Sequence, residues 1–65
     1  MIDGFHVRVT VKTQDGKSRS YQHGFNFRDK NLAKQAGKEA FENTPDVIMV
    51  EVFQDGVANP IALFQ

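Results

Sequence analysis

Residues 5–12 read Phe5-His6-Val7-Arg8-Val9-Thr10-Val11-Lys12. Apolar side chains hold every odd position and polar side chains hold every even one, which is typical of a strand that buries one face. The sequence therefore predicts a β-strand over residues 5–12. Its polar face presents Arg8, Thr10 and Lys12 to solvent.

The residues that follow predict a hairpin. A two-residue turn at Asp15-Gly16 would set the valines of the first strand against polar residues of the second. A three-residue loop, Gln14-Asp15-Gly16, with Gly16 in the left-handed conformation instead places Val9 opposite Tyr21 and Phe5 opposite Phe25. This register puts the aromatic side chains on the valine face, so it is preferred, and it predicts a second strand over residues 17–25.

Residues 30–43 predict one amphipathic helix. Small and apolar side chains recur with helical spacing at Leu32, Ala33, Ala36, Gly37, Ala40 and Phe41. Asp29 is the expected N-cap, and the Thr44-Pro45 pair ends the helix because a residue before proline disfavours helical geometry. Gly37 predicts a close approach of the helix backbone to a sheet, or alternatively a contact between helices of an oligomer.

Residues 47–65 contain twelve apolar residues out of nineteen. Strands are predicted over residues 47–54 and 57–64, with a turn at Asp55-Gly56. Asn59-Pro60 interrupts the last strand, so that strand is expected at an edge or bulged. The elements together predict a single α+β domain over residues 1–65, with the order β-β-α-β-β. Its antiparallel sheet has the strand order 2-1-3-4, with the helix packed on one face.

The strand at residues 47–54 is apolar on both faces, and one helix covers only one of them. Either the face with Ile48, Val50 and Val52 or the face with Val47, Met49 and Phe53 is then left for another chain, a ligand or the termini. A domain of this size also has a marginal core, so a homodimer is expected. The expected self-association residues are Val47, Met49, Glu51, Phe53 and Ile61.

The formal net charge is zero, but the charges are unevenly distributed along the chain. Residues 1–38 hold all eight Lys and Arg residues and three acids, so they carry a net charge of +5. Such a basic region is a candidate surface for a protein partner or for nucleic-acid phosphates. The candidate residues are Arg8, Lys12, Lys17, Arg19, Lys30, Lys34 and Lys38.

No motif for catalysis, metal binding or nucleotide binding is recognisable. In the preferred register His6 and His23 point to opposite faces, so they do not share a metal, and the five glycines are too scattered for a phosphate-binding loop. Ser18 and Ser20 near His23 lack an orienting acid. His6 is interpreted as a solvated strand residue, and His23 as packing at the margin of the valine face. We expect neither enzymatic activity nor a cofactor.

Glu51 is the one acid within the predicted third strand. It reaches the margin of the sheet, pairs with Arg19, or serves as a polar group within a ligand or dimer surface.

The absence of cysteine and of an apolar leader leads us to expect a cytoplasmic protein with no membrane span. The favoured hypothesis is a small non-enzymatic protein-binding module, a regulator or inhibitor of a larger partner, of the type found in phages or mobile elements. Its unpaired sheet edges suit β-strand addition. The alternative is a nucleic-acid-binding accessory protein that uses the basic first hairpin.

Overall fold

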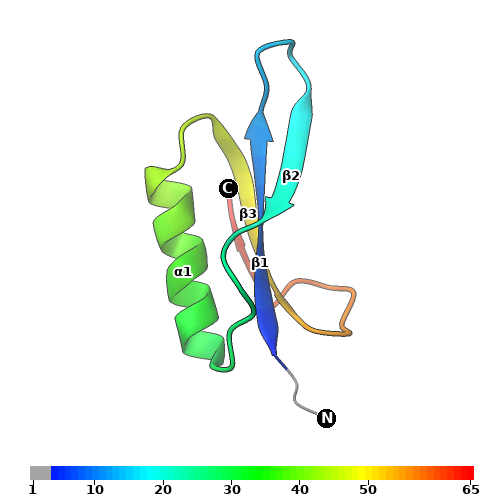
Figure 1. Ribbon diagram of the computed structural model, residues 1–65, viewed down its shortest axis with the longest axis vertical. Helices are drawn as coiled ribbons and strands as arrows, with labels where there is room; N and C mark the ends of the chain where they lie inside the picture. Colours follow the sequence, from blue (N-terminus) through cyan, green and yellow to red (C-terminus); the bar gives the residue numbers. More distant parts are fainter. Residues whose placement is uncertain (1–3) are drawn as a thin grey trace.

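A computed structural model describes residues 4–65 and shows the predicted α+β fold (Figure 1). The elements follow the order β1 (Phe5–Lys12), β2 (Ser18–Gln22), α1 (Lys30–Asn43), β3 (Val47–Gln54) and β4 (Ala62–Phe64). The four strands form one antiparallel sheet in the predicted order β2-β1-β3-β4. The helix covers one face of this sheet, and the opposite face is open.

The first hairpin has the predicted loop. Gly16 adopts the left-handed conformation with φ of +83°, and Val9 lies opposite Tyr21. The expected pairing of Phe5 with Phe25 is wrong, because β2 ends at Gln22 and Gly24 turns the chain with φ of +73°. Phe27 lies opposite Phe5 instead, and Phe25 is 91% exposed.

The helix begins and ends as its sequence predicts. The Asp29 carboxylate accepts hydrogen bonds from the backbone amides of Asn31 and Leu32. At the other end, the Thr44 amide donates to the Ala40 carbonyl, and the chain leaves in an extended conformation before Pro45. These caps account for the boundaries at residues 30 and 43.

Gly37 lies where the helix is closest to the sheet. A Cβ atom built on Gly37 would lie 2.8 Å from Val52 Cγ2 and 3.3 Å from Phe64 Cε2. The predicted close approach to a sheet is therefore confirmed. The core between the two layers is formed by buried side chains of β1, α1 and β3, namely Val7, Val9, Ala33, Ala40, Val50 and Val52.

The second half of the sheet differs from the expectation at two places. Thr10 lies opposite Met49 but Val11 lies opposite Val47, so Ile48 is an extra residue and forms a bulge in β3. The last strand covers only residues 62–64 rather than 57–64. Residues 57–60 are exposed and form a loop that contains Asn59-Pro60, as expected where proline removes a backbone donor.

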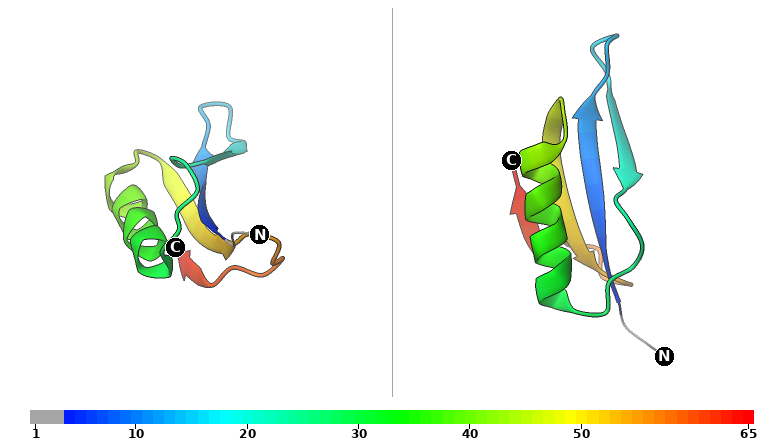
Figure 2. Two further views of the ribbon diagram at one scale, coloured as in Figure 1. Left: turned by 60° about the horizontal axis from the view of Figure 1, so that its bottom comes forward. Right: turned by 60° about the vertical axis from the view of Figure 1, so that its left-hand side comes forward.

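The molecule is elongated, with principal extents of 41 × 20 × 17 Å. The β1–β2 hairpin extends beyond the end of the helix, and the three views agree on this arrangement (Figures 1 and 2). Within residues 4–65, no helix is long and apolar enough to cross a membrane.

Candidate binding surface

The strand β2 is the most exposed element of the sheet. All five of its residues are exposed, and the helix packs against β1, β3 and β4 but not against β2. One edge of β2 pairs with β1, and no strand within residues 4–65 pairs with its other edge. This edge therefore presents backbone groups to any chain that approaches it.

The hydrogen-bond pattern shows which backbone groups of β2 are free. Beyond the two ends of the strand, the Thr13 amide donates to the Lys17 carbonyl and the His23 amide donates to the Val7 carbonyl. Antiparallel pairs alternate between bonded and non-bonded residues, so the odd residues Arg19 and Tyr21 point their backbone groups toward β1. The outward backbone groups are those of Ser18, Ser20 and Gln22.

The side chains of β2 divide between the two faces of the sheet. Arg19 and Tyr21 share the helix side, where the guanidinium carbon lies 5.8 Å from the centre of the Tyr21 ring. Tyr21 was expected to be buried on this side, but the helix does not reach it and it is 36% exposed. On the open side, the Ser20 hydroxyl lies 2.8 Å from the Thr10 hydroxyl.

The structure separates the seven basic candidates into three groups. Arg8 is engaged, because its Nε and Nη2 donate to Glu51 Oε1 at 3.0 and 2.7 Å. Lys12, Lys17 and Arg19 lie together on the hairpin, are exposed, and form no ion pair with any residue in the 4–65 range. The other three lie on the helix layer, away from the hairpin: Lys30, Lys34 and Lys38.

Glu51 pairs with Arg8 and not with Arg19. The strand order places β1 between β2 and β3, and Arg8 lies directly opposite Glu51 in the register. The Glu51 side chain is only 11% exposed, whereas that of Arg8 is 49% exposed. The neighbouring cation therefore neutralises a carboxylate that would otherwise be costly to bury.

On the sheet face opposite the helix, side chains of β1 lie over Phe53 of β3. Phe53 is 7% exposed because the His6 ring stacks on it at 5.2 Å and the Arg8 guanidinium lies 5.0 Å from its centre. His6 is therefore half-buried and not a solvated strand residue. Its Nδ1 also lies 2.7 Å from Asp55 Oδ1, so the imidazole is held from two sides.

A polar clasp, defined here as His6, Asp55, Asn26 and Gln22, joins three segments on this side. Asn26 Nδ2 donates to Asp55 Oδ2 at 2.9 Å, and Gln22 Nε2 donates to Asn26 Oδ1 at 3.1 Å. The clasp ties β1 and the end of β2 to the loop after β3. Sequence reasoning missed it, because His6 and Asp55 are 49 residues apart and no local pattern links them.

The five expected self-association residues do not form one surface. Val47 and Ile61 pack against the core, since the bulge at Ile48 turns Val47 to the helix side. Met49, Glu51 and Phe53 remain together on the open face, but Glu51 and Phe53 are buried. Leu63, opposite Glu51, is the exposed apolar residue beside them, with 48% of its surface accessible.

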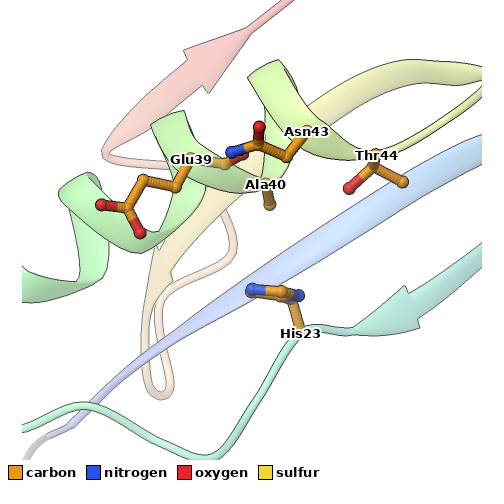
Figure 3. A pocket seen from close by; sticks show the side chains of 5 residues that line it. All are labelled: His23, Glu39, Ala40, Asn43 and Thr44. Atoms are coloured by element: carbon orange, nitrogen blue, oxygen red, sulfur yellow. The ribbon is translucent and has the colours of Figure 1, made fainter.

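A hollow of about 340 Å³ lies between the last turns of α1 and the residue that follows β2 (Figure 3). Its lining residues are His23, Glu39, Ala40, Asn43 and Thr44. His23 is half-buried and faces Ala40 across the hollow, at the margin of the valine face.

Asp15 in the hairpin loop has a pKa below its ordinary value. The Thr13 hydroxyl donates to its carboxylate, and the Lys17 amide donates to the same oxygen at 3.2 Å. Both hydrogen bonds favour the charged form. The carboxylate therefore fixes the loop at the tip of the exposed hairpin.

Comparison with protein families, curated proteins and solved structures finds no match for this chain. Within residues 4–65, no three His, Cys, Asp or Glu side chains lie close enough together to hold a metal ion.

Proposed function

We propose that this protein is a small non-enzymatic binding module that adds an extended segment of a larger protein to the free edge of β2. The observation that carries the proposal is the exposure of all five β2 residues outside the cover of the helix. In β-strand addition the backbone hydrogen bonds give affinity, and alternate side chains give specificity. The outward backbone groups of Ser18, Ser20 and Gln22 are available to form these backbone hydrogen bonds.

The side chains on the two faces of β2 can give specificity for the added strand. On the helix side, Arg19 and Tyr21 offer a cation and a flat aromatic surface to the added strand. Tyr and Arg are the residue types enriched among the energetically dominant contacts of interfaces. A module of this size acts by occupying a surface of its partner, as a regulator or inhibitor of phage or mobile-element type does.

We treat the His6–Asp55 pair as a structural contact that holds the loop after β3 against β1. His6 and Asp55 form a histidine–carboxylate pair, but no Ser or Thr hydroxyl in the described chain is bonded to His6.

Substitution of Ser20 tests the proposal. In Ser20→Pro the outward backbone amide is lost while the ladder to β1 is kept, since proline is tolerated where its missing donor faces solvent. The variant also loses the hydroxyl contact with Thr10, so Ser20→Ala is the matched control. Tagged wild-type, Ser20→Ala and Ser20→Pro proteins are incubated with extract of the native host, and the retained proteins are compared.

We expect one partner to be retained by wild type and Ser20→Ala and lost with Ser20→Pro, while all three proteins keep the same circular dichroism spectrum. A photoreactive amino acid at Ser18 should cross-link to that partner, and the same group at Leu63 should not. Equal retention of the partner by Ser20→Pro and Ser20→Ala would contradict strand addition at β2.

Nucleic-acid binding by the same hairpin is the second candidate. Lys12, Lys17 and Arg19 are free of ion pairs with described residues, and two exposed aromatic side chains, Tyr21 and Phe25, lie along the same segment. Cations that track phosphates and aromatic rings that stack on bases characterise single-strand binding. Oligonucleotide affinity that falls steeply with salt and is lost in Lys12→Glu/Arg19→Glu would favour this function. No binding at low salt would exclude it.

The homodimer remains a prediction. The open face offers Met49 and Leu63 to a second copy, while Phe53 is already covered by His6 and Arg8. Sedimentation over a hundredfold concentration range should show a mass increase that Leu63→Lys abolishes. A constant monomer mass would exclude self-association over that range.

A further inference from the structure

The outward edge of β2 has the length and the accessibility that a second copy of the same strand needs. Its five residues are all exposed, and the outward backbone groups belong to Ser18, Ser20 and Gln22. The helix packs on β1, β3 and β4, and the β1–β2 hairpin extends beyond the end of the helix (Figures 1 and 2). The helix therefore leaves this edge open to another sheet.

The backbone pattern limits how two antiparallel copies of β2 can meet. Residues whose backbone groups point outward lie opposite one another, and each such pair exchanges two N–H···O bonds. A two-fold axis through Ser20 sets Ser20 opposite Ser20 and Ser18 opposite Gln22, so all five residues of each strand are paired. An axis through Arg19 pairs only residues 18–20 of each copy and sets two cations directly opposite each other, which is unfavourable.

The register centred on Ser20 also makes the side chains of the two copies complementary. On the helix side, Arg19 of each copy lies opposite Tyr21 of the other. Within one chain the Arg19 guanidinium carbon already lies 5.8 Å from the centre of the Tyr21 ring, so the same kind of cation–π contact can form across the edge. On the open side, the uncharged residues Ser18 and Gln22 face each other. Arg19 is the only charged residue of the strand, so no like charges are directly opposed.

The antiparallel arrangement keeps the basic hairpin tips of the two copies apart. Lys17 lies opposite His23 of the second copy, so six residues separate the two Lys17 positions, about 20 Å at about 3.3 Å per residue. This distance exceeds the screening length of about 8 Å at physiological ionic strength. Repulsion between the tips therefore opposes the pairing only weakly.

We propose that two copies of this protein pair through their β2 edges in the register centred on Ser20 and so join their sheets. The contact spans five residues of each copy, so it is weak and short-lived and leaves most molecules unpaired in dilute solution. It is distinct from the open-face contact around Met49 and Leu63. Its regulatory role rests on the proposed function, because the second copy occupies the edge that the segment of the larger protein needs.

Cross-linking between single cysteines tests the register, since the chain contains no cysteine of its own. A bis-methanethiosulfonate with a two-carbon spacer is added to purified full-length Ser20→Cys, to Ser18→Cys, or to an equal mixture of Ser18→Cys and Gln22→Cys. All proteins also carry Leu63→Lys, which removes association through the open face. The two Ser18 positions of a pair lie four residues apart, about 13 Å, which this reagent does not span. Ser18→Cys is therefore the matched control for Ser20→Cys.

We expect covalent dimers to form about tenfold faster from Ser20→Cys, and from the mixture, than from Ser18→Cys alone, because pairing holds these thiols close together. Tyr21→Arg in the Ser20→Cys protein sets Arg19 against a cation and should slow cross-linking about tenfold, equivalent to about 1.4 kcal/mol over the two symmetric pairs. Tyr21→Glu should accelerate it, and all variants should keep the wild-type circular dichroism spectrum. Equal rates for Ser20→Cys and Ser18→Cys, or equal effects of Tyr21→Arg and Tyr21→Glu, would overturn the proposal.

Ser20→Pro separates this inference from the proposed function. If strand addition is wrong but self-pairing is right, Ser20→Pro retains its host partner and Ser20→Cys cross-links faster than Ser18→Cys. If self-pairing is wrong but strand addition is right, Ser20→Pro loses the partner and the two cysteine variants cross-link at equal rates.

Discussion

The two edges of the sheet differ in length, cover and side-chain chemistry. The edge strand β4 has three residues, follows a loop with Asn59-Pro60, and packs Phe64 against Phe41 of the helix at 6.3 Å. The edge strand β2 has five residues, contains no proline, and does not touch the helix. The edge strand β4 is short and packs one face against the helix, and short edge strands limit unwanted strand pairing, whereas β2 is longer and lies outside the cover of the helix.

Under the proposed function, this difference separates the residues that stabilise the fold from the residues that bind a partner. The side of the sheet near β3 and β4 contains the tight helix contact at Gly37, the Arg8–Glu51 pair and the clasp around Asp55. The hairpin end contributes little to the core beyond Val9 and Val11 of β1. Substitutions on the two sides should therefore have separable effects, from unfolding on one side to changes in binding alone on the other.

The largest effect on stability is expected on the β3–β4 side of the sheet, where the helix lies closest to it. Gly37→Val would place methyl groups against Val52 and Phe64, where a Cβ atom alone is already too close. Overpacking should lower the free energy of unfolding by about 2–3 kcal/mol, measured by urea denaturation. Gln35→Val is the control for helix propensity at an exposed position. Equal losses of stability in the two variants would mean that the helix does not approach the sheet as closely as described.

A smaller effect on stability is expected at the Arg8–Glu51 pair. Although Arg8 lies on the basic strand β1, its contact with Glu51 of β3 places it among the residues that stabilise the fold. Arg8→Ala leaves the Glu51 carboxylate nearly buried without its cation and uncovers Phe53. Thermal and urea unfolding should show a loss of about 1–2 kcal/mol. Lys12→Ala, an exposed cation with no ion pair among the described residues, should change stability by less than about 0.5 kcal/mol. A loss in Lys12→Ala as large as that in Arg8→Ala would remove this distinction.

The smallest effect is expected at the hairpin tip and depends on pH. The lowered pKa of Asp15 means that its charged form stabilises the fold above the pKa of the unfolded chain, and that this contribution is lost as pH falls through the folded value. Asp15→Asn should therefore be slightly less stable than wild type near pH 6, and the two melting temperatures should converge as the pH falls through the folded pKa of Asp15. A difference that persists at low pH would assign the effect to something other than this carboxylate.

Local sequence patterns predicted the elements whose boundaries depend on neighbouring residues. Asp29 and Pro45 enclose the helix, and the face pattern around Gly16 gave the register of the first hairpin. Gly37 predicted the close contact because a glycine in a helix interior otherwise only lowers stability. Each of these depends on chemistry within a few residues of the position concerned.

The errors arose where distant segments meet. Arg8 and Glu51 are 43 residues apart, so choosing between Arg8 and Arg19 as the partner of Glu51 required the strand register. The bulge at Ile48 turns Val47 to the helix side while Met49 stays on the open face, and an apolar run gives no sign of it. Of the candidate site, sequence predicted the exposed basic hairpin, but it did not predict the clasp or the hollow at His23.

Amide hydrogen exchange across β2 tests the central claim most directly. In the free protein the amides of Ser18, Ser20 and Gln22 should exchange rapidly while that of Tyr21 is protected, because only the outward groups lack a partner among the residues that the structure describes. In complex with the captured partner, the same three amides should become protected and the β4 amides should be unchanged. Protection that appears along β4 while Ser18, Ser20 and Gln22 still exchange rapidly would contradict the account.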